Sequence, residues 1–137
     1  MSRIAYVNGE FLPLDEARIS ILDRGFLFAD GIYEVSAVLD GRLVDNEAHL
    51  VRLARSVREI ALHLPETPER IEEIQKELIA RNDLIEGVVY LQVTRGAADR
   101  DFAFPKGVKP SLVMFTQVKK HRRFSGRPDR HCGENPA

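Results

Sequence analysis

The sequence predicts an α+β domain in which a largely antiparallel sheet is combined with two helices. Two Asx-Gly pairs each lie between short apolar segments, which is typical of β-hairpins. Two later segments repeat apolar residues at helical spacing, and two β-branched segments follow them. Strands joined mostly by hairpins, with paired helices inserted, favour this class over a doubly wound parallel sheet.

The first hairpin lies at the start of the chain. Residues 4–7 and 10–12 have the composition of strands, and Asn8-Gly9 between them tolerates the positive φ angles of a two-residue turn. Residues 14–30 have no clean period and contain two turn signals, so we expect an ordered connection there.

The second hairpin combines residues 32–39 and 42–44 around Asp40-Gly41. Successive side chains of a strand point to opposite faces of a sheet. Tyr33 and Glu34 therefore cannot both face the same pocket.

The two helices follow. Residues 46–63 carry apolar side chains at helical spacing, and Pro65 is expected to end this helix. Thr67 is a suitable N-cap for a second helix over residues 68–82. Segments 87–94 and 111–118 are then predicted to be buried strands, joined by a long connection.

Composition sets limits on function. The 137 residues are 44% apolar and carry a formal net charge of −1, which indicates one globular domain and favours neither nucleic acid nor an anionic membrane as partner. No apolar run approaches the roughly 18 residues of a membrane span, and no signal peptide is apparent. We therefore expect no membrane partner and a cytoplasmic location. The single cysteine, Cys132, cannot form an internal disulfide.

The last 19 residues differ from the rest. Residues 1–118 hold 14 Lys and Arg against 19 Asp and Glu, whereas residues 119–137 hold 6 against 2 and show no apolar period. We expect this basic tail to be disordered and solvated, with nucleic-acid binding as the alternative.

Few residues suggest chemistry on their own. There is no glycine-rich nucleotide loop, and His49 and His63 lack the i, i+4 spacing of a helical zinc site, so we predict no metal site. The guanidinium groups of Arg52, Arg95 and Arg100 are suited to bind a phosphate or a carboxylate. The alternative interpretation is that they are ordinary solvated charges.

Four segments occur in order along the chain: Tyr6-Val-Asn-Gly-Glu, Asp23-Arg-Gly-Phe-Leu-Phe-Ala-Asp-Gly-Ile-Tyr-Glu34, His49-Leu-Val-Arg-Leu53 and Tyr90-Leu-Gln-Val-Thr-Arg-Gly96. With these segments the chain resembles the class IV (fold type IV) pyridoxal-phosphate aminotransferases, and within them the D-amino acid transaminases. Each segment is weak alone, but together they span the chain from about residue 4 to 118. The resemblance implies that residues 1–118 form the small N-terminal domain of a homodimeric enzyme.

The resemblance also implies site residues. Arg52 looks like the arginine that binds the phosphate of the cofactor, pyridoxal 5'-phosphate (PLP). Tyr33 and Arg100 look like members of the trap for the substrate α-carboxylate, with Arg100 reaching across the dimer interface. Glu34 and His49 match motif positions to which we assign supporting roles.

Two departures from the family pattern stand out. The trap usually reads Arg-x-His, whereas this chain has Arg100-Asp101-Phe102, which leaves the preferred amino acid open. The Schiff-base lysine of the family belongs to a larger second domain. None of the five lysines in this chain matches its motif: Lys76, Lys106, Lys109, Lys119 and Lys120.

From these departures we expect a chain that is inactive alone. The hypothesis is a truncated transaminase in which the basic tail is the product of a frameshift and the C-terminal domain is absent. Within the same fold, the alternatives are a branched-chain aminotransferase or an aminodeoxychorismate lyase. Outside enzymes, the alternative is a small-domain binding or dimerisation module.

Overall fold

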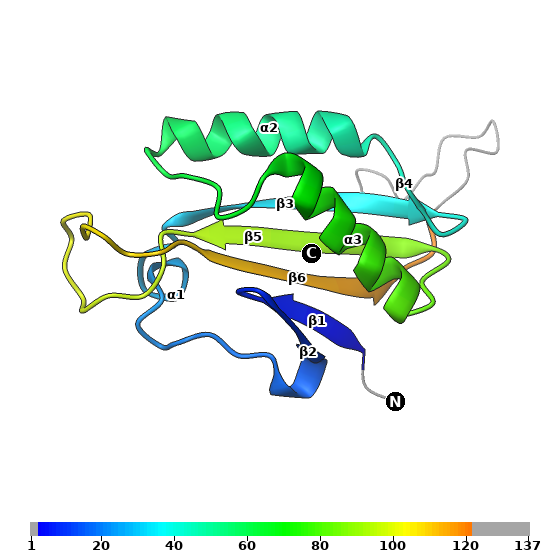
Figure 1. The fold of residues 1–137 in the computed structure, drawn as a ribbon, viewed down its shortest axis with the longest axis horizontal. Coiled ribbons are helices and arrows are strands. Elements are labelled where there is room, and N and C mark those ends of the chain that lie inside the picture. Colours follow the sequence, from blue (N-terminus) through cyan, green and yellow to red (C-terminus); the bar gives the residue numbers. More distant parts are fainter. Residues whose placement is uncertain (1–2, 122–137) are drawn as a thin grey trace, which may run out of the picture.

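The computed structural model describes residues 3–121, and their central feature is one antiparallel sheet of six strands (Figure 1). Its spatial order is β2-β1-β6-β5-β3-β4. The strands are β1 (Ile4–Val7), β2 (Glu10–Pro13), β3 (Gly31–Leu39), β4 (Arg42–Leu43), β5 (Gly87–Thr94) and β6 (Ser111–Val118). Every strand pair is antiparallel, which confirms the predicted fold class.

Both predicted hairpins are present, and their turns explain the glycine signals. Asn8 and Gly9 have φ angles of 46° and 98°, and Asp40 and Gly41 have φ angles of 52° and 72°. Two consecutive positive φ angles are those of a type I′ turn, whose twist matches that of the flanking strands.

Helices α2 (Asn46–Glu59) and α3 (Pro68–Arg81) cover one face of the sheet (Figure 1). Thr67 caps α3 as predicted, because its hydroxyl oxygen accepts a hydrogen bond from the Arg70 N–H at 3.1 Å. The core lies between the helices and the sheet. Its fully buried members include Leu53 and Val57 of α2, Ile74 and Leu78 of α3, and Met114 of β6.

The first of these helices ends earlier than residue 63, the predicted end. Helix α2 stops at Glu59, and Ala61 then adopts a left-handed conformation with φ of 55°. The Leu62 N–H donates to the Val57 carbonyl at 2.8 Å, which is the bond of a Schellman motif. Glycine usually marks this position, and because alanine occupies it here no residue before Pro65 indicates the end of the helix.

Two short helices were not predicted within the connection that precedes β3. They are a 3₁₀ helix, η1 (Leu14–Glu16), and α1 (Arg24–Phe28). Asp23 is the N-cap of α1, and its carboxylate accepts from the Gly25 N–H at 2.8 Å and from the Ser111 hydroxyl at 2.7 Å. A helix of five residues is too short for its apolar period to be recognised in sequence.

The opposite face of the sheet carries a ladder of aromatic rings from three adjacent strands. Tyr33 stacks on Tyr90 with ring centroids 5.6 Å apart, and Tyr90 stacks on Phe115 at 4.9 Å. Neither α2 nor α3 covers this face (Figure 1), and the Tyr33 end of the ladder is exposed.

Most of the basic tail, residues 122–137, lies outside the described residues, so its predicted disorder stays a prediction. Cys132 is among them. Within residues 3–121, no helix has the length and apolar character needed to cross a membrane.

Candidate functional site

Glu34 is the centre of the first polar cluster, which we call the Glu34 cluster, with His49 and Arg52 as its other members. The alternation of β3 places Glu34 on the helix-covered face and leaves its side chain 6% exposed, while Tyr33 on the other face is 63% exposed. This confirms that the two residues serve different sides of the sheet.

Helix α2 supplies both partners of the Glu34 carboxylate. His49 and Arg52 are three residues apart and therefore lie on one face of the helix. Arg52 donates from Nε to Oε2 at 2.9 Å and from a terminal nitrogen to Oε1 at 2.7 Å, and His49 Nδ1 lies 2.8 Å from Oε1. The structure thus brings three of the five predicted site residues together.

The cluster favours a charged Glu34. Burial raises the pKa of the carboxyl, but hydrogen bonds and charge from Arg52 and His49 outweigh it and hold the pKa below its ordinary value. The same hydrogen bonds and charge from Glu34 raise the pKa of Arg52. A bidentate pair of this kind fixes the plane of the guanidinium group.

Arg52 remains accessible even though it is paired. Its side chain is 58% exposed, whereas that of Glu34 is almost fully buried. The hydrogen bonds to Glu34 use Nε and one terminal nitrogen, which leaves N–H groups available to a second anion. Arg52 is therefore a cation that is held in a fixed orientation and still faces solvent. It is neither an ordinary solvated charge nor fully occupied by its carboxylate partner.

A buried polar chain fixes α2 against β3. The Ser36 hydroxyl donates to Asn46 Oδ1 at 3.0 Å, and Asn46 Nδ2 donates to Gln75 Oε1 at 2.9 Å. Ser36 lies two residues after Glu34 on the same face, and Asn46 is the first residue of α2. These bonds set the position of the helix that carries Arg52, and no spacing rule in the sequence indicated them.

Arg100 lies apart from the Glu34 cluster, on the connection between β5 and β6. Its guanidinium carbon is 5.2 Å from the ring centroids of both Phe28 and Phe102. The Tyr33 ring instead stacks on Tyr90. The structure therefore does not join these two residues within one chain, and the expected trap that they form with a neighbouring subunit stays a prediction.

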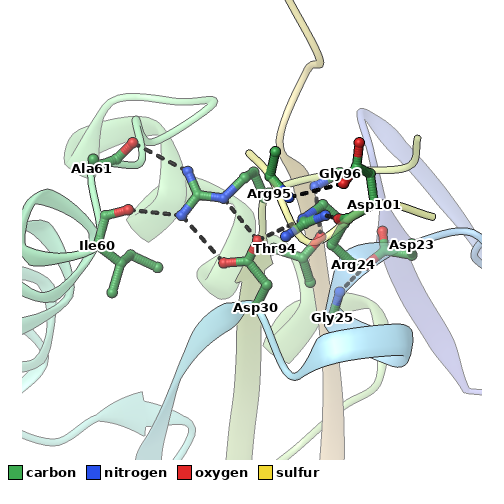
Figure 2. A network of polar contacts seen from close by, with 11 residues as sticks. Asp23, Arg24, Gly25, Asp30, Ile60, Ala61, Thr94, Arg95, Gly96 and Asp101 are labelled. Carbon is green, nitrogen blue, oxygen red and sulfur yellow. Dashed lines mark hydrogen bonds and ion pairs between the residues drawn. The ribbon is translucent and has the colours of Figure 1, made fainter. Parts of the chain in front are cut away.

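A second cluster, which the sequence did not reveal as one, joins Asp30 to Arg24 and Arg95 (Figure 2). We call it the Asp30 cluster. Arg24 Nε and Arg95 Nε both donate to Asp30 Oδ2, at 2.8 Å and 2.7 Å. The side chain of Arg95 is only 7% exposed, so the interpretation of it as a solvated charge was wrong, and the carboxylate that it binds is that of Asp30 in the same chain.

Comparison with known proteins shows the family of the chain. The family model for amino-transferase class IV matches residues 31–134, which contain the Glu34 cluster, Arg95 and Arg100. The chain belongs to the class IV aminotransferases.

Curated relatives within class IV support the more specific resemblance. The chain is 42% identical over 113 residues to a D-alanine aminotransferase of Staphylococcus epidermidis, covering 82% of this chain and 40% of that protein. It is 36% identical over 109 residues to the D-alanine aminotransferase of Bacillus licheniformis, covering 80% and 38%. The chain thus spans about two fifths of the length of these relatives.

Solved structures of two other proteins share the fold of this chain. A branched-chain amino acid aminotransferase from Escherichia coli superposes with a TM-score of 0.80 at 14% identity, covering 87% of this chain and 42% of that one. A 4-amino-4-deoxychorismate lyase from Pseudomonas aeruginosa does so with a TM-score of 0.69 at 30% identity, covering 93% and 42%. Proteins with the names of both alternative activities therefore share this fold.

Among residues 3–121, no group of three or more His, Cys, Asp and Glu side chains is arranged to hold a metal ion. The predicted cytoplasmic location and homodimer stay predictions.

Proposed function

We propose that this chain supplies the small N-terminal domain, residues 1–118, of a PLP-dependent D-amino acid transaminase. The observation that carries the proposal is the Glu34 cluster. It holds the guanidinium of Arg52 in a fixed plane and leaves the side chain 58% exposed. Identity of 42% to a D-alanine aminotransferase supports the substrate class.

The residues present fit the phosphate end of PLP. An oriented arginine binds a phosphate through parallel N–H groups, which a lysine cannot do. Glu34 would keep Arg52 in place, and His49 would help to hold the carboxylate through Oε1, the oxygen that also accepts from the terminal nitrogen of Arg52. When bound, PLP supplies the carbonyl that takes up the amino group and stabilises charge on the amino acid.

The substrate carboxylate would be bound by Tyr33 and Arg100. The Tyr33 ring is fixed by stacking on Tyr90, and Arg100 is in contact with two phenylalanine rings, so each polar group is presented on a rigid support. With Phe102 beside Arg100, the trap would have one hydrogen-bond donor fewer than Arg-x-His.

A larger second domain would complete the enzyme and would carry the Schiff-base lysine. The relatives support this, because this chain covers 40% of the Staphylococcus epidermidis protein. In the complete enzyme the lysine would move a proton at the α-carbon of the amino acid. We propose that the 137-residue chain alone is inactive in transamination.

A homodimer would bring Arg100 to the site of the other subunit. Exposed apolar side chains in the same connection as Arg100 support an interface there, since Phe102 and Phe104 are 78% and 59% exposed. Sedimentation equilibrium of the 137-residue chain should then give twice the monomer mass. A monomer at all concentrations would contradict the homodimer.

The activity is tested with a chimera in which residues 1–118 replace the matching segment of the Staphylococcus epidermidis D-alanine aminotransferase. The chimera, the parent enzyme and the 137-residue chain are each supplied with PLP, D-alanine and 2-oxoglutarate. L-Leucine and aminodeoxychorismate are offered separately. The parent enzyme controls for the assay, and the chimera carrying Arg52→Ala controls for dependence on this chain's site.

We expect the chimera to transaminate D-alanine and the Arg52→Ala chimera to need far more PLP for the same rate. A folded chimera that prefers L-leucine or aminodeoxychorismate would replace the proposal with the corresponding class IV activity. Turnover of D-alanine by the homogeneous 137-residue chain would contradict its proposed inactivity. A folded chimera without any of these activities would favour a binding or dimerisation module.

A further inference from the structure

The connection between β5 and β6 is attached to the rest of the molecule through the Asp30 cluster (Figure 2). Asp30 follows α1 directly, and its side chain is 11% exposed. Arg24 and Arg95, which share its carboxylate, are 4% and 7% exposed. Burial raises the pKa of Asp30, but hydrogen bonds and charge from the two arginines outweigh this effect. The pKa therefore lies below its ordinary value, and the carboxylate stays ionised.

Arg24 connects Asp30 to the residue that follows Arg100. Its Nε donates to Asp30, and one of its terminal nitrogens donates to the carbonyl oxygen of Asp101 at 2.6 Å. Its backbone N–H also donates to the Gly96 carbonyl at 2.8 Å. A single arginine thus holds the connection near its start and at its middle, and both hydrogen bonds depend on the position of α1.

Arg95 connects the same carboxylate to the end of α2. One terminal nitrogen donates to Ile60 O at 2.7 Å and the other to Ala61 O at 3.2 Å. Carbonyls at a helix C-terminus lack partners within the helix, so this arginine satisfies groups that would otherwise need water. The Phe104 ring lies 3.8 Å from the Arg95 guanidinium carbon and covers the cluster from the connection.

We propose that Asp30 is a positioning residue which, through Arg24 and Arg95, fixes residues 96–104 and so sets the position of Arg100. Asp30 is suited to this because one carboxylate orients two guanidinium groups, and their remaining N–H groups reach Asp101 and the end of α2. The effect on substrate binding rests on the proposed function of Arg100. The positioning itself is independent of that function.

The first test measures hydrogen–deuterium exchange of the 137-residue chain by mass spectrometry. Asp30→Asn keeps the shape of the side chain and removes its charge. Asp99→Asn is the matched control, because Asp99 is an exposed carboxylate in the same connection. We expect exchange of residues 96–104 to rise by at least about tenfold in Asp30→Asn, and by more than exchange of β5 and β6, with the control like the wild type.

A second variant keeps the proposal testable if Asp30→Asn does not fold. Arg24→Lys retains a positive charge near Asp30, but an ammonium group cannot reproduce the fork that bonds both Asp30 and the Asp101 carbonyl. A larger rise in the exchange of residues 96–104 than in that of β5 and β6 is expected here too. Unchanged exchange in that segment, or an equal rise throughout the sheet, would overturn the proposal.

The consequence for substrate is measured in the enzyme form that proves active in the chimera test. Asp30→Asn should raise KM for D-alanine about tenfold, with little change in kcat or in PLP affinity. Arg100→Ala, measured in parallel, separates the two proposals. If Arg100→Ala leaves KM unchanged, the proposed function of Arg100 fails and the substrate consequence fails with it. If Arg100→Ala raises KM and Asp30→Asn does not, the positioning role alone is overturned.

Discussion

The Asp30 cluster and the Glu34 cluster use the same chemistry in two different environments. In the first, one carboxylate binds two arginines that are 4% and 7% exposed. In the second, one carboxylate binds an arginine that is 58% exposed and a histidine that is 24% exposed. The same kind of ion pair therefore holds segments together in one place and presents a cation to solvent in the other.

The difference follows from what surrounds each guanidinium group. Arg95 uses its N–H groups on Asp30 and on two carbonyls at the end of α2, which leaves little capacity for a ligand. Arg52 uses only one edge of its fork, on Glu34. An arginine is thus available to bind an anion when its carboxylate partner is buried but its own side chain is exposed.

The largest expected effect on stability is that of Asp30→Ala. The substitution leaves two buried arginines without their anion, which costs about 3–5 kcal/mol of unfolding free energy. Urea denaturation monitored by circular dichroism measures the loss. Asp99→Ala, at an exposed position, should change stability by no more than about 0.5 kcal/mol. Equal losses in the two variants would contradict the cost expected for leaving the two buried arginines without their anion.

Glu34→Gln should have a smaller effect, a loss of about 1–3 kcal/mol, because the buried amide satisfies its partners only in part. Arg52 can return to water, whereas the arginines of the Asp30 cluster cannot. The same denaturation experiment gives the comparison. A loss larger than that of Asp30→Ala would reverse the proposed ranking of the clusters.

Acidification should weaken both clusters, since the pKa values of Asp30 and Glu34 are both lowered in the folded protein. Each carboxylate therefore contributes stability that is present above its unfolded pKa of about 4 and is lost as pH falls through the lower folded pKa. Unfolding free energies measured from pH 6 to about pH 2.5 should decline below about pH 4.5. Asp30→Asn should make the decline shallower, and a slope identical to that of the wild type would contradict the linkage.

The smallest effect on stability is expected for Arg52→Lys, although its effect on the cofactor should be large. Lysine keeps the charge and loses the fork, so PLP affinity in the chimera should fall about tenfold or more. Fluorescence titration of the chimera with PLP provides the measurement. Arg55→Lys is the matched control, because Arg55 is also exposed on α2 and is paired with Glu59 on the helix surface. An equal loss in both variants would remove the special role of Arg52.

The sequence by itself determined the strand order along the chain and the positions of both hairpin turns. It did so because type I′ turns require residues that tolerate positive φ angles, and Asn8-Gly9 and Asp40-Gly41 meet that local requirement. It also separated Tyr33 from Glu34, since alternation is a property of any strand. The family motifs singled out Arg52, His49 and Glu34 before their contacts were known.

Only the tertiary structure decided which arginines are free. Arg95 and Arg100 lie in one connection and have the same side chain, yet the first is buried on Asp30 and the second is exposed. The end of α2 was decided in the same way, because Arg95 binds the carbonyls of Ile60 and Ala61 from 34 or more residues away. Such contacts depend on which segments the sheet brings together, and no local pattern of residues encodes that juxtaposition.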